Sequence, residues 1–119
     1  MRLLVPYLAT HVLRPFHRFF PDMLWRVDAA APTAYLTFDD GPTSECTQDL
    51  LDILAEYNAQ ATHFLVGHHA EQHPDLVQAI VDEGHRVGNH TYSHPDPWTT
   101  SQEELSDELE KTTRILHDL

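Results

Sequence analysis

Four residues of this 119-residue chain have the types and the spacing that metal-assisted hydrolysis needs. Asp39 and Asp40 are adjacent in the stretch TFDDGP, and His90 and His94 are four residues apart in HTYSH. Two neighbouring carboxylates repel each other unless a cation or a proton lies between them. One aspartate and two imidazoles form a ligand set typical of catalytic zinc, which keeps a further position for water.

This ligand set predicts separate roles for the two aspartates. Zinc bound by Asp40, His90 and His94 would lower the pKa of a bound water to about 7. Asp39, held off the metal, would accept a proton from that water as the general base. The alternative is an aspartate-rich turn that caps the next helix, and the aspartate pair alone does not decide between the two interpretations.

The histidines need context, because the chain has ten of them and a four-residue spacing is then a weak signal. His69 and His73 share this spacing, but we expect them where a helix begins, away from a strand end and facing solvent. His90 and His94 follow a predicted strand, and the prolines after them predict a loop. We interpret His63 as a hydrogen-bonded core residue of a strand. The remaining histidines are assigned to the surface, to loops or to an N-terminal extension: His11, His17, His68, His85 and His117.

Hydrophobic periodicity predicts three strand–helix units. The first unit is a buried strand over 34–38 and a helix from Thr43 or Ser44 to Asn58. The second is a strand over 61–66 and a helix from Pro74 to Gly84. The third is a strand over 85–89 and a helix that begins at a capping box of Ser101 and Glu104. Such alternation predicts an α/β fold with a parallel sheet, whose ligands lie at the carboxyl ends of the strands. The Gly-Pro pair after Asp40 is expected to end the first strand and to turn both aspartates toward one site.

The charge balance excludes several classes of partner. Nineteen acidic against seven basic residues give a formal net charge of -12, so we expect no binding to nucleic acid or to anionic lipid. Residues 1–32 are expected to form a helical extension rather than a signal peptide, because prolines and charges interrupt its apolar runs. No stretch approaches the about 18 apolar residues of a membrane span. Cys46 is the only cysteine, which fits a reducing compartment. We expect a cytoplasmic location without membrane attachment, with cell-envelope association as the alternative.

The order of these motifs resembles the polysaccharide deacetylase family. TFDDGP, ATHFLVG, EGHRVGNHT and HTYSH follow one another as in the NodB-like deacetylases of chitin oligomers, peptidoglycan and related N-acetylated sugars. The resemblance covers residues 33–119 and implies a distorted (β/α) barrel. It implies that Asp39 is the catalytic base and that Asp40, His90 and His94 are metal ligands. The implied metal is zinc or another divalent metal such as cobalt or manganese. The implied reaction hydrolyses an N-acetyl group of an N-acetylglucosamine-containing oligo- or polysaccharide to acetate and a free amine.

Two departures from the family pattern change this prediction. His63 stands where the family usually has phenylalanine. The family's later segments carry an arginine that orients the base, an aspartate, and a Leu-x-His whose histidine acts as the acid, and residues up to Leu119 do not include them. We therefore expect 33–119 to be the amino-terminal part of a deacetylase domain, three strand–helix units of a partial barrel. A second chain that completes the barrel is one option.

Two alternatives to an active deacetylase stay open. A complete ligand set without the late acid would give a metal- or sugar-binding module without turnover, and a chain that folds poorly alone would be an inactive fragment. Trp25 and Trp98 are expected to pack against the protein rather than to bind sugar, although Trp98 lies four residues past His94.

Overall fold

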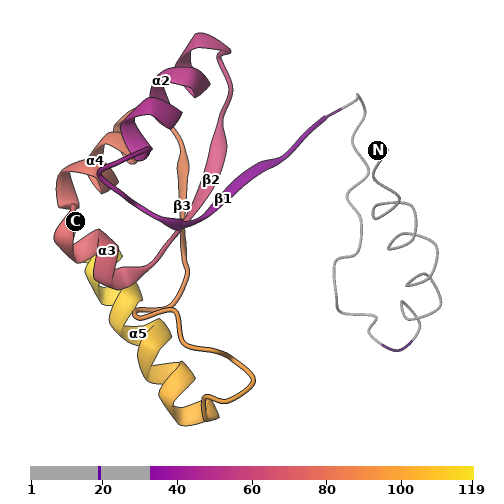
Figure 1. The fold of residues 1–119 in the computed structure, drawn as a ribbon, viewed down its shortest axis with the longest axis vertical. Helices are drawn as coiled ribbons and strands as arrows, with labels where there is room; N and C mark the ends of the chain where they lie inside the picture. The colour runs from indigo at the N-terminus through magenta and orange to yellow at the C-terminus, as the bar shows by residue number, and fades with distance from the viewer. Residues whose placement is uncertain (1–18, 20–32) are drawn as a thin grey trace. The chain divides into compact units, whose positions relative to one another are not determined.

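Seven helices and strands follow one another in the described part of the chain (Figure 1). The computed structural model describes Phe19 and residues 33–119, so the predictions for the helical extension, His11, His17 and Trp25 lie outside the described residues. The boundary between residues 32 and 33 stays a prediction. The elements are β1 (Leu36–Gly41), α2 (Thr47–Glu56), β2 (Ala61–Leu65), α3 (Gly67–Gln72), α4 (Pro74–Asp82), β3 (Arg86–Asn89) and α5 (Gln102–Asp118).

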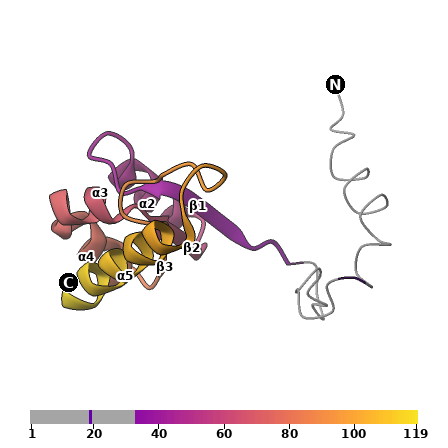
Figure 2. The same ribbon diagram turned by 90° about the horizontal axis from the view of Figure 1, so that it is seen from below.

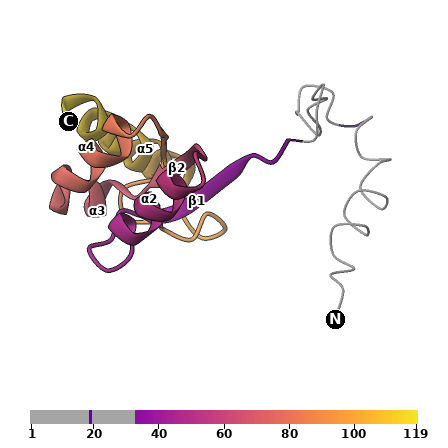
Figure 3. The same cartoon turned by 90° about the horizontal axis from the view of Figure 1, so that it is seen from above.

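The three strands form a parallel sheet in the order β1-β2-β3, which confirms the predicted α/β fold. Leu65 of β2 belongs to a buried cluster with residues of α2, α3 and α4, namely Leu51, Ala70, Val77 and Ile80. Val87 of β3 and Ile115 of α5 pack against the same cluster, so the helices lie on one side of the sheet (Figure 3). Each fully buried leucine or isoleucine stabilises this layer by about 1.5–3 kcal/mol.

The later helices begin and end where the sequence predicts. α4 has Pro74 in its first turn and ends before Gly84, whose φ of 83° is readily adopted by glycine. At the start of α5, the Ser101 hydroxyl accepts the Glu104 N–H at 3.2 Å, and the Glu104 carboxylate accepts the Ser101 N–H at 3.0 Å. The backbone N–H and the hydroxyl of Ser101 both donate to the Glu104 carboxylate and lower the pKa of Glu104. None of the described helices is both long enough and apolar enough to cross a membrane.

Two predictions for the first strand–helix unit are wrong. β1 spans Leu36–Gly41 rather than 34–38, and most of its residues are exposed rather than buried, because β1 lies at an edge of the three-stranded sheet. The helix begins at Thr47, not at Thr43 or Ser44. Thr43 donates its backbone N–H to Thr47 Oγ1 at 2.8 Å, which holds a turn ahead of the helix.

A short helix, α3, lies between β2 and α4, where the periodicity alone predicts only the helix that starts at Pro74. Its first residue, Gly67, packs directly against α5. A Cβ atom at Gly67 would lie 2.5 Å from Thr112 Oγ1 and 3.0 Å from Tyr92 Cδ2, so only glycine permits this approach. Helix α3 therefore brings β2, α5 and the loop after β3 into contact.

The core contains two histidines whose environment differs from the prediction. His63 is 3% exposed, but its Nε2 has no hydrogen-bond partner in the described part of the chain. His85, expected in a loop or on the surface, is buried, and its Nδ1 accepts the Ala61 N–H at 3.3 Å. The two imidazole rings lie 5.3 Å apart. Burial, followed by the charge of His85, lowers the pKa of His63.

This buried histidine predicts sensitivity to acid. The lowered pKa means that folded His63 binds fewer protons than unfolded His63, whose pKa is about 6.5. The free energy of unfolding should therefore fall as the pH drops below about 6.5, by at most about 1.4 kcal/mol per pH unit from this residue. Denaturant unfolding across this pH range should show a shallower slope for His63→Phe. The same slope in His63→Phe as in wild type would contradict the assignment, and His117→Gln, at an exposed site, is the control.

Candidate metal centre

One carboxylate and two imidazoles meet at the carboxyl ends of β1 and β3. Asp40 Oδ1 lies 3.2 Å from His90 Nε2 and 3.4 Å from His94 Nε2. One potential ligand atom from each of the three residues lies within 4.8 Å of the other two. The structure therefore brings together the three residues that the sequence predicts as metal ligands, and their role as ligands stays a prediction.

The backbone of β1 directs Asp40 toward the histidines. Phe38 pairs with His63 and Gly41 with Leu65, so β1 has one extra residue between these pairs and forms a bulge. Asp40 lies in this bulge with a φ of 67°, a left-handed conformation that aspartate adopts more readily than most residues. β1 ends at Gly41, so the Gly-Pro pair ends the strand as the sequence predicts, but the strand continues through both aspartates instead of ending ahead of them. The bulge inside the strand changes the direction of the Asp40 side chain.

His69 lies beside this cluster, although the sequence predicts the pair His69 and His73 away from any strand end and facing solvent. Its Nδ1 lies 3.0 Å from the backbone carbonyl oxygen of Asp40, and a carbonyl only accepts, so Nδ1 donates. Both histidines are half-buried. The prediction fails because α3 follows β2 almost directly. His69 is four residues past Leu65, the last residue of β2, and this short distance was the signal that could have placed it.

The loop after β3 presents His90 and His94 from a backbone that other elements hold. The first residues of α3 donate to it, with Gly67 N–H to Thr91 O at 2.8 Å and His68 N–H to Tyr92 O at 3.0 Å. Figure 2 shows this loop, residues 90–101, connecting β3 to the long helix α5. The two ring centroids of His90 and His94 lie 4.9 Å apart. The imidazoles are thus held side by side.

The donor set and the two distances from Asp40 fit a tetrahedral metal ion. Two ligand atoms bound to one tetrahedral zinc at about 2.0–2.1 Å are about 3.3 Å apart. The two distances from Asp40 Oδ1, 3.2 and 3.4 Å, agree with this value. The side chains of Asp40 and His94 are 68% and 57% exposed, which leaves room for a water or a substrate on the solvent side.

Asp39 is not part of this ligand cluster. It precedes Asp40 in β1, and both residues line a cavity of about 190 Å³ together with residues of α2 and β2, among them Thr47 and His63. A larger cavity, of about 600 Å³, lies between the loop after β3 and α5 and includes neither aspartate. Asp39 is therefore adjacent to the cluster through the backbone, and its role as a base stays a prediction.

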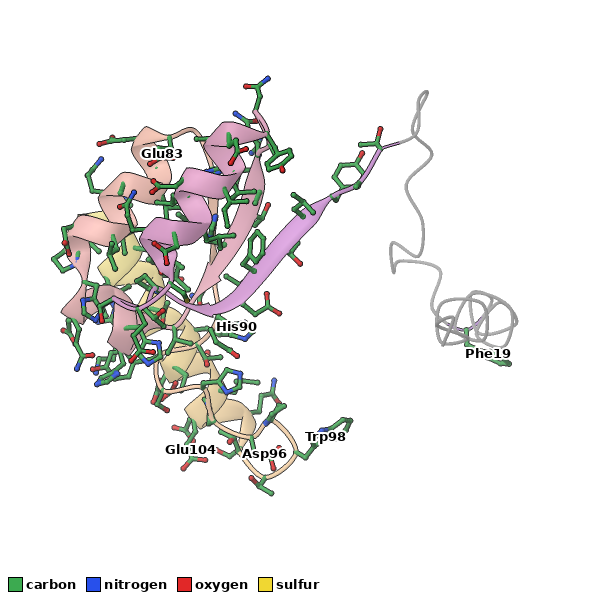
Figure 4. The ribbon with its side chains drawn as sticks, turned by 45° about the horizontal axis from the view of Figure 1, so that its top comes forward. Phe19, Glu83, His90, Asp96, Trp98 and Glu104 are labelled. Atoms are coloured by element: carbon green, nitrogen blue, oxygen red, sulfur yellow. The ribbon has the colours of Figure 1, made fainter. Side chains whose placement is uncertain are left out.

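Trp98 does not pack, contrary to the prediction. It is 93% exposed, and Figure 4 shows it at the outer tip of the loop, directed away from the ribbon. Asp96 forms this turn by accepting the Trp98 N–H on its carboxylate at 2.9 Å and the Thr99 N–H on its carbonyl at 3.1 Å. The turn leaves the indole without neighbours to bury it.

A family model for polysaccharide deacetylases matches residues 26–119. The chain belongs to the polysaccharide deacetylase family. One relative is a chitooligosaccharide deacetylase from Rhizobium leguminosarum bv. trifolii, which is 46% identical to this chain over 82 residues. The matched residues are 69% of this chain and 38% of the relative. A peptidoglycan-N-acetylglucosamine deacetylase from Bacillus cereus is 48% identical over 84 residues, 71% of this chain and 30% of the relative.

The fold of this family member is also similar to a solved structure. Peptidoglycan deacetylase PdaC from Bacillus subtilis superposes with a TM-score of 0.72 at 35% identity, over 77% of this chain and 46% of that protein. These matches confirm the family resemblance of the motifs. The chain spans about a third of the length of the curated deacetylases it matches.

The contact between His69 and Asp40 generates a prediction for metal affinity. Outer hydrogen-bond partners of metal ligands typically contribute 10–100-fold to affinity. His69→Phe removes the donor to the Asp40 carbonyl, and we expect zinc affinity to fall about tenfold in competition with a chromophoric chelator. His117→Gln, at an exposed site near the C-terminus, should bind zinc as wild type does. Equal affinities for wild type and His69→Phe would show that this hydrogen bond does not orient Asp40.

Proposed function

We propose that this chain holds the metal ligands and the catalytic base of a metal-dependent deacetylase, which removes N-acetyl groups from N-acetylglucosamine units of an oligo- or polysaccharide. The observation that carries the proposal is the pair of distances from Asp40 Oδ1 to His90 Nε2 and His94 Nε2, 3.2 and 3.4 Å, which agree with a tetrahedral ion. Family membership supports the reaction class. The names of the relatives, a chitooligosaccharide deacetylase and a peptidoglycan-N-acetylglucosamine deacetylase, support the substrate class.

In the proposed mechanism Asp40, His90 and His94 would hold the metal, with zinc favoured by the nitrogen and oxygen donors. When bound, the metal supplies Lewis-acid chemistry, which lowers the pKa of water and polarises the amide carbonyl. Asp39 accepts a proton from the water that attacks the acetyl carbon. The amide C–N bond then breaks, the proton that Asp39 accepted passes to the departing nitrogen, and the amine and acetic acid leave and ionise to ammonium and acetate. The exposed side of the cluster admits a sugar within a longer polymer.

A module that binds metal or sugar without turnover is the second candidate. Within the described part of the chain, no fourth His, Cys, Asp or Glu belongs to the cluster of ligand atoms. The three candidate ligands would be occupied by the metal and would not supply an acid for the departing amine. Loss of a general acid typically slows such a reaction 10²–10⁴-fold. Zinc binding without acetate release would support this second candidate.

Acetate release tests the proposed reaction. The zinc-loaded chain, incubated at high concentration with N-acetylglucosamine oligomers, should release acetate above a blank without protein, and a chelator should abolish the release. Asp39→Asn keeps the shape of the side chain but removes the base, so the rate should fall 10²–10⁴-fold. Asp49→Asn, in the first turn of α2, is the matched control. Undiminished activity in Asp39→Asn would exclude Asp39 as the base.

The two histidine pairs with the same spacing give a separate prediction. His94 belongs to the ligand cluster and His73 does not. We expect His94→Ala to weaken zinc binding by at least 100-fold, since it removes one of three ligands, and His73→Ala to leave the affinity within a few-fold of wild type. Isothermal titration with zinc measures both. A larger loss in His73→Ala than in His94→Ala would move the metal to His73, at the junction of α3 and α4, and overturn the assignment.

A further inference from the structure

The carboxylate of Glu108, on α5, binds the loop that carries the two candidate histidine ligands. Its Oε2 accepts the backbone N–H of Tyr92 at 2.8 Å and that of Ser93 at 2.6 Å. Its Oε1 accepts the Ser93 hydroxyl at 2.9 Å. One side chain thus satisfies three donors in the segment between His90 and His94.

The residues on either side of this contact have unfavourable backbone conformations. Thr91 has a φ of 65° and His94 a φ of 55°, and neither is a glycine. A left-handed conformation costs about 1–2 kcal/mol for such residues, so surrounding contacts must hold it. The Glu108 contacts lie between the two strained positions. They therefore restrict the segment whose relaxation would move His94 relative to His90.

A second side chain ties the same segment to α5. Asn89 donates its amide to Leu109 O at 2.8 Å and to Thr113 Oγ1 at 2.9 Å. Its Oδ1 accepts the Thr91 N–H at 2.9 Å. Helix α5 therefore binds the loop directly at the Tyr92 and Ser93 N–H groups and indirectly through Asn89 of β3, while α3 binds its carbonyl groups. Glu108 is the charged member of this arrangement.

The protonation of Glu108 agrees with this geometry. Burial raises the pKa of its carboxyl group, but the hydrogen bonds from Ser93 and Tyr92 and the charge of Lys111 outweigh burial and lower the pKa overall. Lys111 Nζ lies 3.2 Å from the centre of the Tyr92 ring, so the cation lies close to the loop as well. The acceptor is ionised at neutral pH, and charge-assisted hydrogen bonds of this kind are the strong ones.

We propose that Glu108 is a positioning residue of the metal centre, which holds the Tyr92–Ser93 backbone so that the imidazoles of His90 and His94 both face Asp40. This inference rests on the proposed function, because it assigns a purpose to the geometry of the predicted ligands. Glu108 does not touch the metal position itself. Glu108 acts through the loop. We therefore expect its substitution to lower zinc affinity in a chain that still folds.

The test compares Glu108→Gln and Glu108→Ala with wild type in the full 119-residue chain. Zinc affinity is measured by competition with a chromophoric chelator, and hydrogen exchange of the Tyr92 and Ser93 amides is measured without metal. Glu108→Ala should bind zinc about 10–100-fold more weakly, and both amides should exchange faster. Glu108→Gln should be intermediate, since its amide oxygen still accepts N–H groups but carries no charge. Glu110→Gln, two residues along the same helix and exposed, should match wild type.

The possible results distinguish the positioning role of Glu108 from the existence of the metal centre. Wild-type affinity in folded Glu108→Gln and Glu108→Ala would overturn the positioning role while leaving the metal centre intact. An equal loss in Glu110→Gln would assign the effect to the general negative charge of α5 and would also overturn it. A wild-type chain that takes up no zinc would contradict the metal centre, and the positioning role with it. If Glu108→Ala fails to fold, Glu108→Gln alone decides.

Discussion

The candidate site depends on the backbone conformation of one residue, the left-handed φ of Asp40 in the bulge of β1. In a regular strand, successive side chains point to opposite faces of the sheet. The extra residue of the bulge breaks this alternation and directs the Asp40 carboxylate toward the loop after β3. His69 donates to the carbonyl of the same residue, so a side chain from α3 supports the unusual conformation. Without the bulge, β1 would present this carboxylate in another direction.

The histidines reach Asp40 through a second strained segment. Thr91 and His94 both have positive φ values, and the peptide groups between them bond to α3 on one side and to α5 on the other. The close contact of Gly67 with Thr112 lets these two helices approach the loop together. The site lies at the ends of the parallel strands. Helices α3 and α5 contribute no candidate ligand, but their contacts with the loop fix the geometry of the site. Strain at both segments is a common feature of sites where function constrains the backbone.

The sequence predicts the composition of this site better than its geometry. Alternating strands and helices are enough to place Asp40 and His90 at one edge of a parallel sheet, and this arrangement is observed. The bulge is not visible in the sequence, because it depends on how β1 pairs with β2 rather than on local propensity. His69 and Glu108 were missed for a related reason. Each is separated by many residues from the segment it binds, and periodicity describes only neighbours along the chain.

X-ray absorption spectroscopy of the chain loaded with one equivalent of zinc tests most directly whether Asp40, His90 and His94 bind one metal ion. We expect nitrogen and oxygen neighbours at about 2.0–2.1 Å, with scattering from two imidazole rings. A sulfur neighbour at about 2.3 Å would show that Cys46 binds the ion instead. Scattering from three or more imidazoles would show that a histidine other than His90 and His94 also binds the ion. Either result would contradict a centre formed by Asp40, His90 and His94.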